Sequence, residues 1–157
     1  MARRLSYLVI LAALFAGCGG CSGSSPNAKL IAQADPICKQ MNARVAAANA
    51  ALGHVTNLRG AHTLQKVAQT GLGLATYEHQ VVADLSALKA PSSLSKDWQT
   101  LLSGMQQLAN YTAQLAVEAK AKNAKLGEET IAKSHELQKQ LIAIATHDGF
   151  QHCGRPN

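Results

Sequence analysis

Apolar residues recur every three or four positions through four long segments of this chain, and this spacing restricts its fold more than any other feature. A helix with 3.6 residues per turn places such positions on one face, whereas a half-buried strand requires strict alternation, which this sequence does not show. The spacing therefore predicts an all-α fold. The expected helices cover residues 28–52, 63–89, 93 or 95–122, and 127–147.

The connections between these segments are short, and short connections favour antiparallel neighbours. We therefore expect an up-down-up-down four-helix bundle that forms one domain over residues 28–157, which is long enough for a single core. Aromatic residues make up only 4% of the sequence, so we expect thin, closely spaced helices. The third segment has the cleanest apolar face, formed by Leu94, Trp98, Leu101, Met105, Leu108, Leu115 and Ala119.

The second segment contains two glycines within its helical pattern, Gly71 and Gly73. Each destabilises the helix by roughly 1 kcal/mol relative to alanine. We expect them to allow close packing of a neighbouring helix and not to form a hinge. The apolar face of this segment consists of Leu64, Ala68, Leu72, Ala75, Val82 and Leu85.

The ends of two helices carry recognisable signals. Asp35 is a good N-cap and Pro36 favours the first helical position, so we expect the main part of the first helix to start there after a short lead-in turn. Gly149 is placed to end the last helix in the left-handed conformation. Phe150 then follows as the apolar residue that packs back onto the helix.

Two positive charges, Arg3 and Arg4, precede an apolar run over residues 5–15. This order is typical of a secretory signal peptide, and the run is too short to span a bilayer as a helix. We therefore expect residues 1–17 to be a signal peptide that is removed from the mature protein.

The small residues immediately before Cys18 resemble the end of a bacterial lipobox, although Phe15 stands where leucine is usual. The resemblance implies that Cys18 is diacylated and becomes the mature N-terminus, and two acyl chains give durable membrane attachment. Residues 18–27 are then the lipidated cysteine and a flexible Gly/Ser-rich tether, which keeps the domain at the extracytoplasmic face of the bacterial cell membrane. The alternatives are lipidation of Cys21, or a redox or zinc site formed by these two cysteines.

Cys38 and Cys153 are the only cysteines in the expected folded part. Two cysteines near opposite ends of an exported domain indicate one disulfide, because the compartment is oxidising. The up-down topology agrees with this pairing, since the start of the first helix and the end of the fourth lie at the same end of the bundle. The alternative is two independent buried thiols.

Two short motifs resemble those of a large group of small exported actinobacterial helical proteins, many of which are predicted lipoproteins. The closing motif is a Gly-Phe pair three residues before the last cysteine, where the group has a similar pair. The resemblance implies a helical fold, the Cys38–Cys153 disulfide and an envelope location, and it implies no particular activity. The opening motif is Ala32-Gln33-Ala34-Asp35-x-Ile37-Cys38-Lys39, followed by Asn42.

The net charge argues against a nucleic-acid partner. The whole chain carries +6, and removal of Arg3 and Arg4 with the signal peptide leaves 13 basic and 9 acidic residues, or +4. This is far below the charge density of a nucleic-acid-binding domain. The sequence has no nucleophile elbow, phosphate-binding loop or paired carboxylates, so we expect a non-catalytic binding or structural role and not an enzyme.

A metal- or haem-binding bundle is the alternative function. Di-iron bundles require Glu-x-x-His on two helices, and that spacing is absent. His79, His135 and Met105 are expected at a similar height, roughly 15–18 Å from one end of the bundle, where they offer two imidazoles and a thioether as ligands of copper or haem. We expect no bound cofactor and keep these three residues as weak metal-site candidates.

Two further polar groups are candidates for binding. His147, Asp148 and His152 lie beside Cys153, where we expect a polar C-terminal hook, with metal binding as the alternative. The loops at the membrane-distal end gather basic residues that offer a contact for an anionic envelope polymer or an acidic protein. Glu118, Glu128 and Glu129 lie nearby and offset part of this charge. The basic residues are His54, Arg59, His62, Lys120, Lys122 and Lys125.

Overall fold

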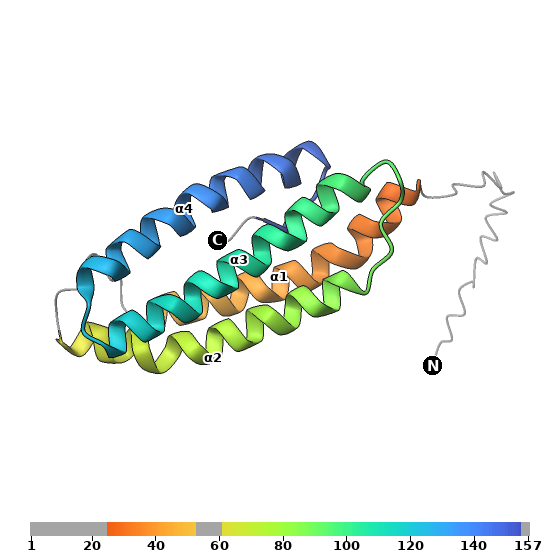
Figure 1. Ribbon diagram of the computed structural model, residues 1–157. Helices are drawn as coiled ribbons and strands as arrows, with labels where there is room; N and C mark the ends of the chain where they lie inside the picture. The colour runs from red at the N-terminus through yellow and green to blue at the C-terminus, as the bar shows by residue number, and fades with distance from the viewer. Residues whose placement is uncertain (1–24, 53–60, 155–157) are drawn as a thin grey trace, which may run out of the picture.

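The computed structural model describes residues 25–52 and 61–154, which form four α-helices and contain no strand. Neighbouring helices alternate in direction along the bundle (Figure 1). The predicted all-α four-helix bundle is therefore confirmed. The helices are α1 (Pro26–Leu52), α2 (Ala61–Ser86), α3 (Ser95–Lys120) and α4 (Ala124–His147).

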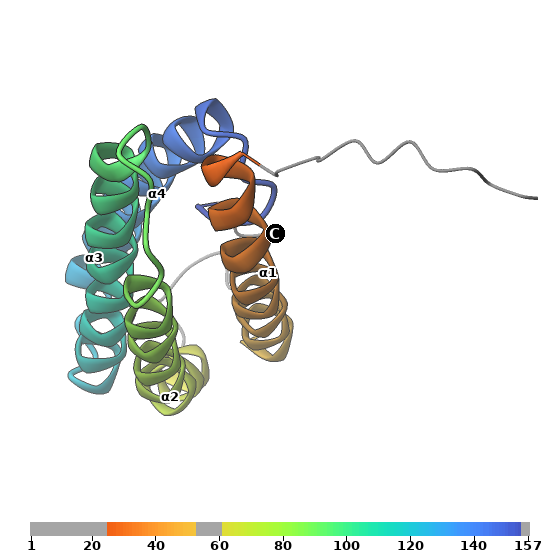
Figure 2. The same cartoon turned by 90° about the vertical axis from the view of Figure 1, so that its right-hand side faces the viewer.

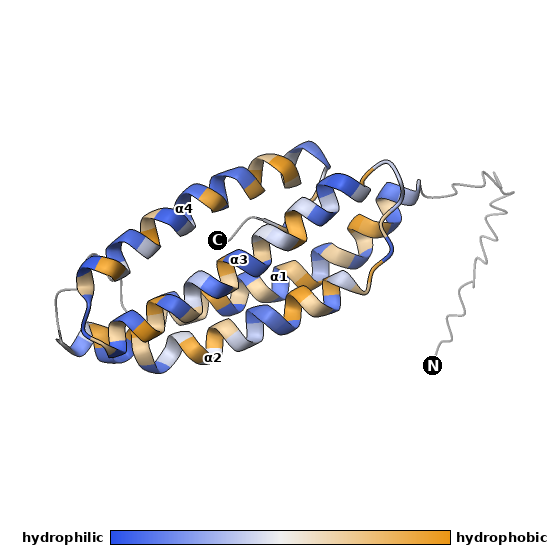
Figure 3. Ribbon diagram, in the orientation of Figure 1, coloured by the Kyte–Doolittle hydropathy of each residue, from blue (hydrophilic) through white to orange (hydrophobic). Residues whose placement is uncertain are grey.

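The four helices do not close the bundle equally on all sides. α2 packs along α3, α3 packs along α4, and α1 packs along α2, whereas α1 and α4 are not in close contact. The end-on view shows the segment after α4 lying between α4 and α1 (Figure 2). We call residues 148–154 the C-terminal hook. Each helix carries both polar and apolar residues around its surface, as expected of helices with one buried face (Figure 3).

α1 begins at Pro26, so the expected lead-in turn at Asp35-Pro36 is wrong. Ser25 acts as the cap, because its Oγ accepts a hydrogen bond from the backbone N–H of Ala28 at 3.2 Å. The helix continues through Pro36, whose ring removes a hydrogen bond to the carbonyl of Ala32. Both of these residues are exposed, so water can replace the lost donor. The last two residues of the expected tether are thus helical.

Asp35 binds the C-terminal hook instead of capping α1. Its carboxylate accepts hydrogen bonds from the backbone N–H groups of Gln151, at 2.9 Å, and His152, at 3.0 Å. The backbone N–H of Cys153 lies 3.4 Å from the same carboxylate. A chain that has left a helix needs partners for its backbone donors, and Asp35 supplies them for three successive residues.

Two more residues on the same face of α1 hold the hook. Cys38 forms a disulfide with Cys153, with the Cα atoms 4.9 Å apart, so the predicted pairing is confirmed. The side-chain amide of Asn42 donates a hydrogen bond to the backbone oxygen of His152 at 2.9 Å. Asp35, Cys38 and Asn42 belong to the opening motif, and all three contact the last described residues of the chain.

The end of α4 follows the predicted pattern. Gly149 has φ of 88°, and the backbone N–H of Phe150 donates to the carbonyl of Ala145 at 2.9 Å. Phe150 is only 1% exposed and its ring stacks on Trp98, with the ring centroids 5.5 Å apart. This contact fixes the hook to the start of α3. α4 begins three residues earlier than expected because the side chain of Asn123 caps it.

The second helix differs from expectation at one apolar position. Leu72 was expected in the buried face, but it is 50% exposed. Its neighbour Gly71 lies at the contact with α3, where an added Cβ would be 2.8 Å from the Cβ of Ala116. Close packing is therefore confirmed at Gly71. At Gly73 an added Cβ would meet nothing within 4 Å, so the expectation fails there.

Candidate ligand-binding site

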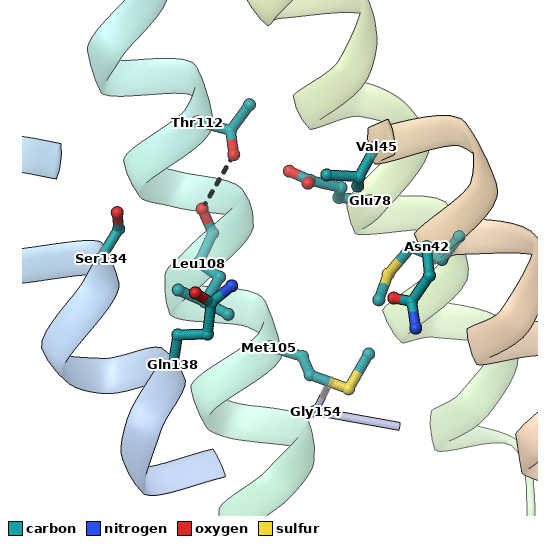
Figure 4. A pocket seen from close by; sticks show the side chains of 10 residues that line it. Asn42, Val45, Glu78, Met105, Leu108, Thr112, Ser134, Gln138 and Gly154 are labelled. Carbon is teal, nitrogen blue, oxygen red and sulfur yellow. Dashed lines mark hydrogen bonds between the residues drawn. The ribbon is translucent and has the colours of Figure 1, made fainter. Parts of the chain in front are cut away.

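A cavity of about 150 Å³ lies between the helices beside the C-terminal hook (Figure 4). All four helices and Gly154 contribute to its wall. Glu78 is the only ionisable side chain among the described residues that line it, and we call it the Glu78 cavity. Its lining consists of Met41, Asn42, Val45, Glu78, Met105, Leu108, Thr112, Ser134, Gln138 and Gly154.

Glu78 points from α2 into the space between α1 and α3 (Figure 4). Its side chain is half-buried, and its Oε2 is fully enclosed without a hydrogen-bond partner among the described residues. The nearby hydroxyl of Thr112 donates to the backbone oxygen of Leu108 at 3.2 Å. An enclosed carboxylate oxygen without a donor costs about 1–3 kcal/mol or more, so it marks a position that a ligand donor would favour.

The protonation of Glu78 follows from this environment. Burial raises the pKa of its carboxyl from 4.5 to about 7, because desolvation disfavours the charged form, while the polar side chain of Thr112 beside it opposes the rise. Glu78 therefore changes charge near neutral pH. The wall around it is otherwise neutral, with Asn42, Thr112, Ser134 and Gln138 as its other polar side chains.

A second cavity of about 150 Å³ lies further along the bundle and shares Val45, Glu78 and Thr112 with the first. Its remaining wall is largely apolar. Glu78 thus stands between two spaces, and each is comparable to an apolar cavity that holds one six-membered ring. The other lining residues are Asn49, Leu52, Val67, Thr70, Gly71, Leu74 and Leu115.

The structure gives the predicted His79–His135–Met105 site no support. Met105 is buried and lines the Glu78 cavity. His79 is half-buried, does not line this cavity, and its Nδ1 forms a hydrogen bond with Gln106. His135 is exposed on α4. The expectation depended on their height along the bundle alone. The direction of each side chain also depends on how its helix is rotated about its axis, which the sequence did not give.

The other expected site residues have different outcomes. Cys18 lies outside the described residues, so its lipidation stays a prediction. Of the basic residues at the distal end, His54 and Arg59 also lie outside them. The described members of that group are all exposed, and their contact with an anionic polymer stays a prediction. These exposed residues are His62, Lys120, Lys122 and Lys125.

The three residues of the expected C-terminal polar group, His147, Asp148 and His152, do not all contact one another. His147 and Asp148 form a hydrogen bond of 2.9 Å between Nδ1 and Oδ1. His152 takes part in the hook through its backbone, which contacts Asp35 and Asn42. The hook that the sequence predicted is therefore present, but its histidines do not act as one group.

Sequence reasoning missed Glu78, although a signal was present. Glu78 follows the apolar-face residue Ala75 by three positions and precedes Val82 by four, so it occupies the buried face of α2. A charged residue at such a position requires a partner or a function. The expectations covered paired carboxylates, and they gave no role to a single carboxylate on the buried face of a helix.

None of the helices that the structure describes combines the length and the apolarity needed to cross a membrane. No protein-family model, curated protein or solved structure matches this chain. The proposed function therefore depends on the sequence motifs and on the geometry around Glu78.

Proposed function

We propose that this chain is a lipid-anchored protein of the bacterial cell envelope that binds a small ligand in the Glu78 cavity and does not catalyse a reaction. The observation that carries the binding role is that Glu78 lines a cavity while its Oε2 is enclosed without a partner among the described residues. Keeping such an atom costs stability, and that cost is reasonable where a ligand provides the missing donor.

The lining defines the class of ligand. Met41, Val45, Met105 and Leu108 provide an apolar wall, while Glu78 provides one acceptor that carries a negative charge when ionised. A small organic ammonium ion matches both parts, because its N–H groups donate to the carboxylate and its hydrocarbon part fills the apolar space. The volume of about 150 Å³ corresponds to a body of about one ring.

A single carboxylate among neutral residues fits binding better than catalysis. General acid–base chemistry places a second group, or a nucleophile, within hydrogen-bond reach of the reacting atoms. Among the described lining residues Glu78 has no such ionisable neighbour.

Isothermal titration calorimetry at pH 8 with benzylammonium as the probe tests the binding role. We expect saturable binding, at least tenfold weaker binding by the Glu78→Gln variant, and weaker binding of the neutral isostere benzyl alcohol. Glu136→Gln is the matched control, because Glu136 is an exposed residue of α4 that pairs with Lys139. Equal binding by wild type and Glu78→Gln, or no binding of the amine, would refute the role of Glu78.

The anchor is supported by the signal peptide, by the residues around Cys18 and by the start of α1 only eight residues later, at Pro26. Such a short connection keeps the bundle close to the membrane. Intact-mass measurement of protein extracted from native membranes should show a diacylated Cys18, and the Cys18→Ser variant should leave the membrane fraction. Mature wild-type protein that washes off with Cys18 unmodified would contradict the anchor without affecting the binding test.

A further inference from the structure

Three ligand-type side chains meet at the end of the bundle where α1 begins. Asp97 lies in the first turn of α3, His147 is the last residue of α4, and Asp148 is the C-cap that follows it. Each offers one oxygen or nitrogen atom, and these atoms all lie within 4.8 Å of one another.

The burial of Asp148 is an independent indication of a ligand. Its side chain is only 2% exposed. Its Oδ1 bonds to His147, whereas its Oδ2 is buried and has no hydrogen-bond partner among the described residues. A buried carboxylate oxygen requires a cation or a donor, and the fold itself supplies none to this atom.

The electrostatic environment favours a cation at this position. Two carboxylates lie together, and the negative dipole end of α4 offsets the positive end that the first turn of α3 brings beside Asp97. The imidazole of His147 is 82% exposed, which leaves one side of the group open to an incoming ion and its waters.

We propose that Asp97, His147 and Asp148 form a binding site for a divalent transition-metal ion such as Zn²⁺. One imidazole nitrogen and two carboxylate oxygens suit ions of this class, whereas Mg²⁺ and Ca²⁺ prefer oxygen ligands alone. Three protein ligands leave positions for water or another molecule. The bound ion would join the start of α3 to the end of α4, next to the C-terminal hook.

The protein contains a natural reporter for this site. Trp98 is its single tryptophan, follows Asp97 directly, and stacks on Phe150, two residues beyond Asp148. A paramagnetic ion bound nearby quenches tryptophan fluorescence. We therefore expect Co²⁺ added to metal-free, oxidised protein to quench Trp98 with a saturable 1:1 profile, and Zn²⁺ to reverse the quenching by competition.

Two variants identify the ligands with little risk to the fold, because neither Asp97 nor His147 is buried. Asp97→Asn and His147→Ala should each weaken Co²⁺ and Zn²⁺ binding at least tenfold. His135→Ala is the matched control, since His135 is an exposed histidine on the same helix. This variant should bind Co²⁺ and Zn²⁺ as tightly as wild type. His152→Ala should also bind normally, because His152 lies outside the ligand group.

Thermal unfolding provides a second readout of metal binding that does not depend on fluorescence. Zn²⁺ should raise the thermal midpoint of wild type and of Glu78→Gln, but not that of Asp97→Asn, as measured by circular dichroism. The proposal is overturned if quenching does not saturate, if His135→Ala weakens binding as much as His147→Ala, or if Asp97→Asn binds as tightly as wild type.

Discussion

The carboxylate of Asp35 accepts a hydrogen bond from the backbone N–H of Gln151 at 2.9 Å, across 116 positions of sequence. The same carboxylate lies within hydrogen-bond distance of the next two backbone N–H groups, those of His152 and Cys153. One side chain of α1 thus satisfies three donors of a segment that has no regular secondary structure. Since α1 and α4 do not pack closely, this segment connects the two sides of the bundle.

Replacement of Asp35 by alanine should destabilise the protein by about 2–4 kcal/mol. Loss of the carboxylate leaves two partly buried N–H groups and one exposed N–H group without their acceptor, and hydrogen bonds to a charged group contribute about 1.5–3 kcal/mol each at most. Urea unfolding of oxidised protein at neutral pH measures the effect. Asp84→Ala is the control, because Asp84 is exposed and, among the described residues, bonds only to Gln80 within α2. It should change stability by less than about 0.5 kcal/mol. Equal effects of the two variants would contradict the role of Asp35.

Removal of the disulfide should cost on the order of 4 kcal/mol. Cys38 and Cys153 close a loop with a sequence separation of 115, and a crosslink over such a loop restricts the unfolded chain strongly. The variant Cys38→Ser/Cys153→Ser should therefore unfold at lower urea concentration than oxidised wild type. Reductant should lower the midpoint of wild type and leave that of the double variant unchanged. If reductant lowered the midpoint of both proteins, its effect would not come from the Cys38–Cys153 disulfide.

Glu78→Gln should change how stability depends on pH. The raised pKa of Glu78, about 7 against 4.5, means that the folded state holds more protons than the unfolded state between these values. The contribution of the raised pKa to the free energy of unfolding is therefore fully present below pH 4.5 and is lost as pH rises through about 7. At pH 8 the free energy of unfolding of the glutamine variant should exceed that of wild type by up to about 3 kcal/mol.

The measurement for Glu78 is the stability difference between variant and wild type at several pH values from 4 to 8. This difference should grow with pH for Glu78→Gln. It should stay flat for Glu136→Gln, in which the replaced carboxylate is exposed. A flat profile for Glu78→Gln would mean that the carboxylate is solvated in the folded protein.

Gly71→Ala and Gly73→Ala form a matched pair with opposite expected signs. A methyl group at Gly71 would lie 2.8 Å from the Cβ of Ala116, so α2 and α3 must separate, at a cost of about 1–3 kcal/mol. The same change at Gly73 meets open space and should stabilise the helix by about 0.5–1 kcal/mol. Thermal unfolding by circular dichroism compares the two variants. Stabilisation by both would show that the contact at Gly71 yields without cost.

The sequence alone was sufficient for the features that depend on local chemistry. Apolar spacing is a property of consecutive residues, so it located four helices to within a few positions at each end. Gly149 was recognised as the end of α4 because a left-handed residue before an apolar one is a local signal. The disulfide was also predictable, since only Cys38 and Cys153 were available and the up-down topology brings their helix ends together.

Only the tertiary structure decided what Asp35 does, because an Asp-Pro pair fits a helix start equally well until the position of the hook is known. The same holds for the enclosed oxygen of Glu78 and for the meeting of Asp97 with His147. These arrangements depend on how far each helix is rotated about its own axis and which helices touch. Periodicity identifies the buried face of a helix but not the atoms that face it from the neighbouring helices. Which side chains meet inside the bundle is therefore decided by the packing of the helices.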